Sequence, residues 1–398
     1  MSLATQKIIA DTLFSETSVQ ASSYSSLAQV ALTNGANLSL KGDYINAAKQ
    51  FQRAISLDPS KDNAVNAYKL MATAYMQAKM PENAIKAYKA SLKVDLTNDE
   101  THVALGNIYY GQGKYSAAVA QYEAAVKISS PSSVNRYSLG QGYMAQGRYQ
   151  EAAEQFEEVI RLAPAEHSGY YALGQVYSKE GNNEKAIAQF LKAIDLNPNF
   201  YAASVDLGSS YADMGQTSDA LQQVSYLLNF APSMASTLNT YITSVTKPKF
   251  LAAYTTGGFT VGFGPGTPVS SLDPYLATPD TTKVFTMTFV FNKAMDHSSV
   301  VNPLNWSISK APLGASFGAY DWGMTPPDTD VPIAPIPVGV LYDTETLTAT
   351  ISFVISQNAD ATGTIDPSHV VFKFSGKDAF GNPMDVTADE YNGISLFT

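Results

Sequence analysis

The sequence predicts two kinds of structure in succession: an all-α superhelix built from repeated helix pairs, and then an all-β sandwich. Three observations carry this prediction. A 34-residue repeat runs through the first part of the chain, an alternation of period two replaces it from about Thr281, and composition and charge change near residue 250. Hydrophobic period distinguishes helix from strand, and a fixed long period indicates a repeat architecture. A chain of 398 residues has room for two or three domains.

The helical repeat is defined by a recurring alanine and by a bulky apolar residue four positions after it. A Leu-Gly-x-x-Tyr element lies upstream of most copies, for example at Leu105–Tyr109 and Leu139–Tyr143. Small residues let two helix backbones approach closely, so each copy is expected to be a helix pair that buries its apolar face only by stacking on its neighbours. The alanines are Ala47, Ala84, Ala118, Ala152, Ala186 and Ala220, and the bulky residues are Phe51, Tyr88, Tyr122, Phe156, Phe190 and Val224.

This pattern resembles the tetratricopeptide repeat (TPR) family. Six copies begin near residues 28, 65, 99, 133, 167 and 201, at one step of 37 residues and four steps of 34. The resemblance implies six helix-turn-helix repeats in a right-handed superhelix, whose concave surface binds protein. The three extra residues in the first step, near Ser60–Asn63, predict a longer loop between the first two repeats.

The stacked repeats need covered ends, and the flanking segments supply candidates. The predicted organisation is an N-terminal capping helix or interaction arm at 1–27, six repeats at 28–234, a C-terminal capping helix at 235–250, a Gly/Thr/Pro-rich linker at 251–280 and the sandwich at 281–398. Both readings of 1–27, as a cap or as an arm that docks on another copy, stay open. The linker also has the composition for a first strand at Phe259–Phe263.

In the TPR family the first helix of each pair lines the concave surface. The residues at the equivalent positions of this sequence are therefore expected to line it, and most of them are uncharged. Amides and tyrosines in successive repeats offer donors, acceptors and apolar area to an extended peptide. Basic residues that a clamp for acidic chaperone tails would need are replaced by Tyr137 and Gln141, which disfavours that subclass. A merely solvated face is the alternative. The predicted groove residues are Lys69, Thr73, Asn107, Tyr110, Tyr137, Gln141, Met144, Tyr171, Gln175 and Lys179, with Met76 and Val103 beside them.

The C-terminal part alternates threonine with large apolar residues, which predicts strands with one buried face. The predicted strands lie at 284–291, 347–353, 370–374 and 394–397. Two local motifs, Phe291–Asp296 followed by Asn305–Ile308 and Asp378–Met384, resemble bacterial immunoglobulin-like domains of surface proteins. The resemblance implies an Ig-like β-sandwich that is structural or adhesive and usually lies outside the cell. The proline-rich segment 323–339 is expected to be an irregular loop that either docks on a neighbour or folds onto its own sheet.

Several classes of chemistry are disfavoured. The chain has no cysteine and only four histidines, which excludes disulfides and makes a dense metal site improbable on composition. A net charge of −10 disfavours nucleic acid as a partner. No apolar run is long enough to span a bilayer. The glycines at 262–266 lack the context of a phosphate loop, and the spacing of Asp328 and Asp330 matches no calcium loop. We therefore expect no catalytic residue, no metal, no cofactor and no enzyme activity.

Two functional hypotheses remain. Residues 251–398 hold 5 lysines and 14 acidic residues, a net −9, whereas residues 1–250 have a net charge of −1. The first hypothesis is a structural subunit that self-assembles through its repeats into a polymer at the cell surface or into an extracellular filament. The alternative is a scaffold that holds a peptide of a different protein in its groove, with the sandwich as spacer or anchor. The N-terminus has no recognisable signal peptide.

Overall fold

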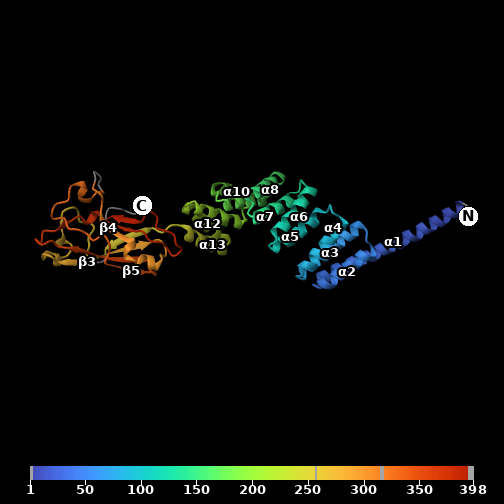
Figure 1. Cartoon of the computed structure of the whole chain (residues 1–398), viewed down its shortest axis with the longest axis horizontal. Helices are drawn as coiled ribbons and strands as arrows, with labels where there is room; N and C mark the ends of the chain where they lie inside the picture. The colour runs from blue at the N-terminus through green and yellow to red at the C-terminus, as the bar shows by residue number, and fades with distance from the viewer. Residues whose placement is uncertain (1–2, 256–257, 314–317, 393–398) are drawn as a thin grey trace. The chain divides into compact units, whose positions relative to one another are not determined.

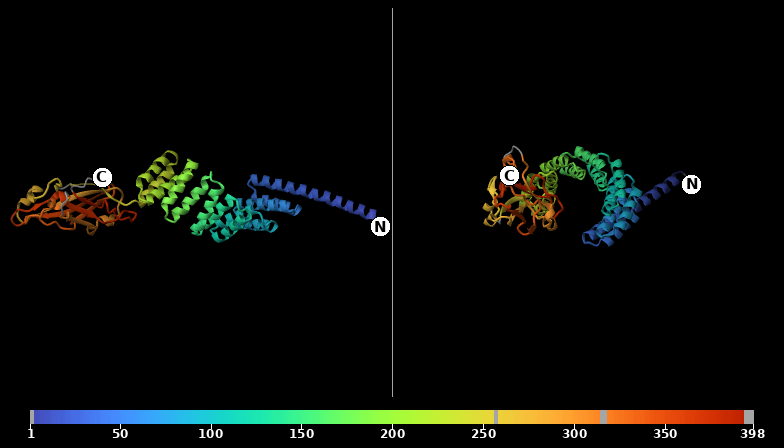
Figure 2. Two further views of the ribbon diagram at one scale, coloured as in Figure 1. Left: turned by 90° about the horizontal axis from the view of Figure 1, so that it is seen from above. Right: turned by 60° about the vertical axis from the view of Figure 1, so that its left-hand side comes forward.

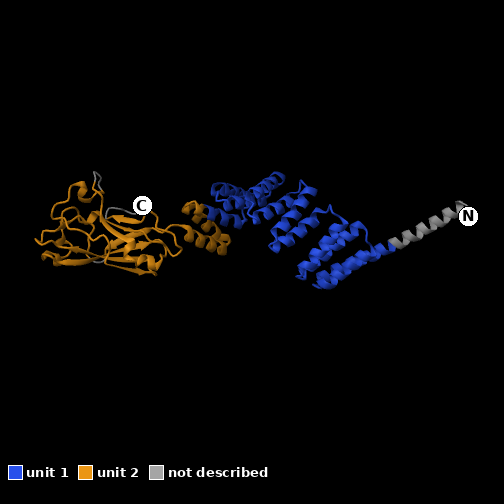
Figure 3. Ribbon diagram, in the orientation of Figure 1, with its two compact units in different colours: residues 1–210 blue, residues 211–398 orange. Residues whose placement is uncertain are grey.

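The computed structural model describes residues 3–255, 258–313 and 318–392, with side chains from Ser22 onward. The chain divides into two compact units, residues 1–210 and residues 211–398 (Figure 3). The first unit is helical, and the second holds the last helices and all the described strands (Figure 1).

The helices of the first unit form consecutive pairs, α1 with α2 and so on to α9 with α10, and the pairs follow a curved path (Figure 2). Helix α11 (Tyr201–Asp213) begins at the end of this unit. The bounds are α1 (Leu3–Leu40), α2 (Tyr44–Leu57), α3 (Lys61–Gln77), α4 (Pro81–Val94), α5 (Asp99–Gly111), α6 (Tyr115–Ile128), α7 (Ser133–Ala145), α8 (Tyr149–Leu162), α9 (His167–Lys179) and α10 (Asn183–Leu196).

The contact inside each pair explains the repeated sequence pattern. All six predicted alanines, from Ala47 to Ala220, have 0% exposure. The repeated glycine of the first helix lies against the aromatic ring of the second. A Cβ atom added at Gly140 would lie 2.7 Å from the ring of Phe156, and the same holds at 2.6 Å for Gly174 and Phe190. At these two positions a Cβ atom would overlap the ring, so glycine is required there; the second repeat has Ala72 at the equivalent position.

The structure differs from two predictions about the first two repeats. Residues 3–27 do not form a separate helix, because α1 runs without interruption from Leu3 into the first helix of the first repeat and ends at Leu40. No proline interrupts this stretch, so nothing forces a break there. The extra residues near Ser60–Asn63 lengthen no loop. They extend α3, which has 17 residues where α5, α7 and α9 each have 13.

The second unit begins with helices and continues as a β domain. Helix α12 (Thr217–Phe230) packs on α13 (Pro232–Val245). A short helix, α14 (His297–Val300), lies among the strands. The strands are β1 (Phe250–Thr255), β2 (Thr267–Pro268), β3 (Thr282–Phe291), β4 (Trp306–Lys310), β5 (Gly339–Asp343), β6 (Thr348–Ser356), β7 (Thr364–Ile365), β8 (Val370–Phe374) and β9 (Glu390–Asn392).

The strands form antiparallel sheets in the orders β1-β3-β6-β5, β4-β8-β9 and β2-β7. The two larger sheets pack against each other through aromatic side chains. The ring of Phe372 in β8 lies 5.7 Å from that of Phe289 in β3 and 5.3 Å from that of Phe353 in β6. Alternate residues of β6 are fully buried, as the period-two pattern predicted. The C-terminal domain is therefore a sandwich of antiparallel sheets, and its immunoglobulin-like character stays a prediction.

The segment predicted as a linker is instead part of the β domain. β1 pairs with β3, and Phe259, Val269 and Leu276 lie in the aromatic core. No strand forms at Phe259–Phe263, because Phe259 enters the core from irregular backbone. The predicted strand at 394–397 lies outside the described residues.

The proline-rich loop 323–339 folds onto its own domain. Val331 is buried in the core, and the carbonyl of Pro335 accepts a hydrogen bond from the backbone N–H of Ile308 at 2.8 Å. The part of the loop from Val331 to Pro335 therefore folds onto its own domain, whereas Met324 and Val338 are exposed.

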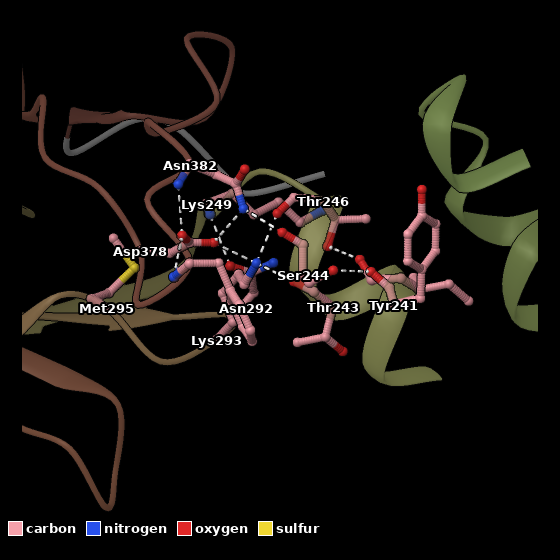
Figure 4. Close-up of polar contacts among 12 residues, drawn as sticks. Tyr241, Thr243, Ser244, Thr246, Lys249, Asn292, Lys293, Met295, Asp378 and Asn382 are labelled. Carbon is pink, nitrogen blue, oxygen red and sulfur yellow. Dashed lines mark hydrogen bonds and ion pairs between the residues drawn. The ribbon is translucent and has the colours of Figure 1, made fainter. Parts of the chain in front are cut away.

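A buried lysine fastens α13 to the β domain (Figure 4). Lys293 follows β3 and is 6% exposed. Its Nζ atom lies 2.5 Å from a carboxylate oxygen of Asp378 and donates to the carbonyl oxygens of Thr243 and, at 2.8 Å, Thr246. The last carbonyls of a helix lack partners and carry partial negative charge, so a cation is favourable there. Lys293 thereby joins the last helix and the sandwich within the second unit.

Candidate protein-binding surface

The inner face of the first unit is formed by the first helices of the pairs. Helices α5 and α7 contact each other directly, as do α7 and α9. Direct contact between successive first helices places them on the inside of the curve. All ten predicted groove residues lie on α3, α5, α7 and α9, and their side chains are half-buried or exposed.

The same tyrosine–glutamine pair recurs on α7 and α9. The Nε2 atom of Gln141 donates to the hydroxyl of Tyr137 at 3.4 Å, and that of Gln175 donates to the hydroxyl of Tyr171 at 2.9 Å. Four residues separate the members of each pair, so they lie one turn apart on the same helix face. Each amide is thus oriented with its oxygen atom, Oε1, free of any partner among the described residues, so the row offers acceptors to the N–H groups of an extended chain.

Asn107 continues this row on α5 with the opposite polarity. Its Oδ1 atom accepts a hydrogen bond of 2.7 Å from the hydroxyl of Tyr122. Its Nδ2 group therefore remains as a donor. Donors and acceptors in one row suit a peptide backbone, which carries both.

The tyrosines of the inner face are held by ring contacts. The rings of Tyr137 and Phe156 lie 5.5 Å apart, those of Tyr171 and Phe200 lie 4.6 Å apart, and Tyr110 meets Tyr115 edge-on at 5.4 Å. Burial raises the pKa of Tyr110 and Tyr137 above the ordinary value. These phenols therefore stay neutral at physiological pH.

Asp206 of α11 adds a carboxyl group that the sequence did not single out. It accepts a hydrogen bond of 3.3 Å from Gln175 Nε2. Burial raises the pKa of Asp206, and the hydrogen bonds of Tyr171 and Gln175 and the charge of Lys179 only partly offset this. Burial, followed by the charge of Asp206, also raises the pKa of Tyr171.

The remaining predicted residues have separate environments. Lys69 forms an ion pair with Glu100, so its ammonium is already engaged, which agrees with the departure from a carboxylate clamp. Thr73 donates to the carbonyl of Lys69 at 3.0 Å. Met144 packs against the core of the middle repeats, and Lys179 is exposed at the end of α9.

An apolar pocket between α1, α2 and α3 was not predicted. It has a volume of about 390 Å³ and borders Thr73 of the inner face. Ala36, Ser39 and Leu40 form its α1 side. Aligning the first two repeats could have indicated the pocket. The small Ala36 and Ser39 occupy the positions that Thr73 and Met76 have 37 residues later.

Neither a metal-binding cluster nor a membrane-spanning helix is found in the part of the chain that the structure describes. Within residues 3–255, 258–313 and 318–392, no group of three or more His, Asp or Glu side chains is arranged to hold a metal ion. No helix among these residues is both long and apolar enough to cross a membrane.

Comparisons with known proteins agree with the helical pattern. Two tetratricopeptide repeat family models match residues 137–201 and 65–98, and a model of anaphase-promoting complex, cyclosome, subunit 3 matches residues 82–159. No curated protein matches the chain. The chain therefore contains tetratricopeptide repeats, followed by a domain of mostly β-strands.

Solved structures of helical repeats are similar over about half of the chain. MamA is 27% identical, over 42% of this chain and 94% of that one, with a TM-score of 0.37. Pseudomonas aeruginosa pilF is 18% identical over 55% and 99% of the two chains, with a TM-score of 0.45. YrrB, titled a TPR protein with an unusual peptide-binding site, is 24% identical over 44% and 88%, with a TM-score of 0.38.

Proposed function

We propose that this chain is a non-enzymatic structural subunit that binds copies of itself and assembles into a filament at the cell surface or outside the cell. TPR proteins mediate protein–protein contacts, and the inner face described above has the chemistry for them. The finer proposal, self-assembly, rests on how charge is distributed along the chain.

Opposite charges gather in two distant parts of the sequence. Residues 3–94, which form the first two helix pairs, hold 10 Lys and Arg against 6 Asp and Glu, a net +4. Residues 251–398 have a net charge of −9. Complementary potentials favour and steer the encounter of the two parts. Because the two surfaces differ, a contact between them in separate copies is heterologous, and it produces a filament wherever the rotation between copies does not close a ring.

The placement outside the cell rests on the resemblance of two motifs in the strand-rich domain to surface-protein modules. Fractionation of the source cells with an antibody against the β domain tests this part separately. Recovery in the soluble cell interior alone would contradict it.

The self-association is tested by sedimentation velocity of the purified full chain across a concentration series at low and high salt. We expect the average mass to rise with concentration at low salt and to fall towards the monomer at high salt. Salt screens exposed charges separated by more than about 8–10 Å near physiological ionic strength. A monomer at every concentration in low salt would contradict the proposal.

The inner face favours a second candidate, a scaffold for an extended peptide of another protein. The amide oxygens of Gln141 and Gln175 and the amide nitrogen of Asn107 are the observation behind it. This candidate predicts a monomer in the sedimentation series. It also predicts that Gln141→Ala with Gln175→Ala weakens capture of the partner, whereas Gln150→Ala, exposed on the second helix α8, leaves capture unchanged.

A further inference from the structure

We propose that the Trp322 turn of one copy inserts into the apolar pocket of the first repeat of a second copy. This inference rests on the proposed self-association and identifies the contact between copies, which is called the joint below. The pocket lies in the first unit and the turn in the second unit, so the two partners are different surfaces of the same chain.

The pocket exists because the first repeat lacks a bulky residue that later repeats have. The position of Ser39 in the first repeat is occupied in the next three repeats by Met76, Tyr110 and Met144. Ala36 likewise occupies the position of Thr73 in the next repeat. The small side chains leave a hollow of about 390 Å³, within the size range of pockets that hold ligands (about 300–1,000 Å³).

The pocket is lined by uncharged residues and lies within repeats of net positive charge. Leu40 is 87% exposed, although it lies at the edge of an apolar cavity. The next residue, Lys41, is exposed, and the first two helix pairs carry the net +4 described above. An apolar side chain from an acidic domain matches both properties.

The Trp322 turn has the complementary character. Trp322 and Met324 are both 59% exposed, on a domain with a net charge of −9. The exposed Asp328 follows in the same loop. Tryptophan is among the residues that most often dominate the energy of protein interfaces.

The backbone of the turn is strained and firmly held. Asp321 and Trp322 have φ angles of 50° and 52°, in the left-handed region that disfavours residues other than glycine. The N–H of Asp321 donates to buried Asp366 at 2.9 Å, and the hydroxyl of Tyr320 donates to Asp330 at 2.7 Å. Strain of this kind persists where the surroundings fix it, and it is concentrated at functional sites. Here it presents an indole ring to solvent.

Two single variants test the two sides of this contact, the turn and the pocket, one at a time. Trp322→Gly removes the indole and relieves the left-handed strain, so we expect a melting temperature equal to or above that of the wild type. Ser39→Met fills the pocket with the residue that the second and fourth repeats use, so we expect it to fold. Circular dichroism checks both.

The test is sedimentation velocity of each variant alone and of an equimolar mixture. Each variant alone should need a concentration at least roughly thirtyfold higher to self-associate, as for loss of an interface hot spot. The mixture should form a 1:1 dimer and no larger species, because only one pairing of turn and pocket remains. The two tryptophans of the chain give a second readout: Trp306 is buried already, so a blue shift on assembly reports Trp322.

The outcomes distinguish the joint from the proposed function. If the wild type and both variants associate equally, self-assembly stands and this joint is wrong. If removal of residues 1–26 abolishes association but Trp322→Gly does not, the N-terminal part of α1 is the occupant and the inference is overturned. A wild type that remains monomeric overturns both proposals.

Discussion

At the scale of single residues, the most consequential contact in the second unit is the buried pair of Lys293 and Asp378. Both side chains are nearly inaccessible to solvent. Two hydrogen bonds from the backbone N–H groups of Phe380 and Asn382, at 2.9 and 2.8 Å, complete the environment of the carboxylate. Burying an ion pair is costly in itself, and removing one partner is worse because the other charge stays buried without compensation.

Lys293→Met is therefore expected to lower the free energy of unfolding of the second unit by about 3–5 kcal/mol. The measurement is chemical denaturation followed by circular dichroism. Lys293→Met combined with Asp378→Asn should lose less than the single variant, because no unpaired charge remains. Equal losses in the single and double variants would show that the pair is not the cause.

The same carboxyl predicts the response to acid. Burial would raise the pKa of Asp378, but the hydrogen bonds of Lys293 and Asn382 outweigh it, so the pKa lies below the ordinary value. A lowered pKa contributes stability that is present above the ordinary value of about 4 and is lost as pH falls through the lowered value. The Asp378→Asn variant should show a flatter dependence of stability on pH below about 4.

Neither role was predictable from the sequence, although both residues belong to the motifs that resemble surface-protein domains. Lys293 donates to carbonyls of α13 that lie some fifty residues earlier in the chain. Such a contact depends on how a helix end meets a loop between strands, and no local pattern encodes it. By contrast, the equivalent positions of Gln141 on α7 and Gln175 on α9 follow from the 34-residue register, and their role in binding stays a prediction.

At the scale of elements, a glycine of the first helix controls the packing of the pair in α1, α5, α7 and α9. Gly140→Ala is expected to cost about 1–3 kcal/mol of stability, because the added Cβ lies 2.7 Å from Phe156. Gly111→Ala is the matched control. It lies in α5 with nothing within 4 Å of an added Cβ, so it should be neutral or stabilising by up to about 1 kcal/mol. Thermal unfolding of the two variants makes the comparison, and equal effects would contradict it.

The elements that the sequence predicted well are those with strong local periodicity. The 34-residue step located the helix pairs, the alternation of threonine with apolar residues located β3 and β6, and a short apolar run located β8. The segment after α13 was misread, because irregular backbone can enter a core as readily as a strand. Phe259 is fully buried with no strand around it. Glycine- and proline-rich composition indicates irregular backbone, but it does not say whether that backbone is buried.

At the scale of the whole chain, opposite charge and complementary shape occur in the same two regions. Positive charge gathers in the first two helix pairs and negative charge in the last domain. An unfilled pocket lies in the first of these regions and an exposed tryptophan in the second. Charge could be counted from the sequence, whereas the pocket and the strained turn required the structure, because each depends on which neighbouring side chains are small or held in place.

Negative-stain electron microscopy of the purified full chain across a concentration series shows whether the chain assembles by itself. We expect regular filaments that lengthen with concentration and shorten at high salt. Uniform isolated particles at every concentration would contradict self-assembly and leave the inner face as a groove for another protein.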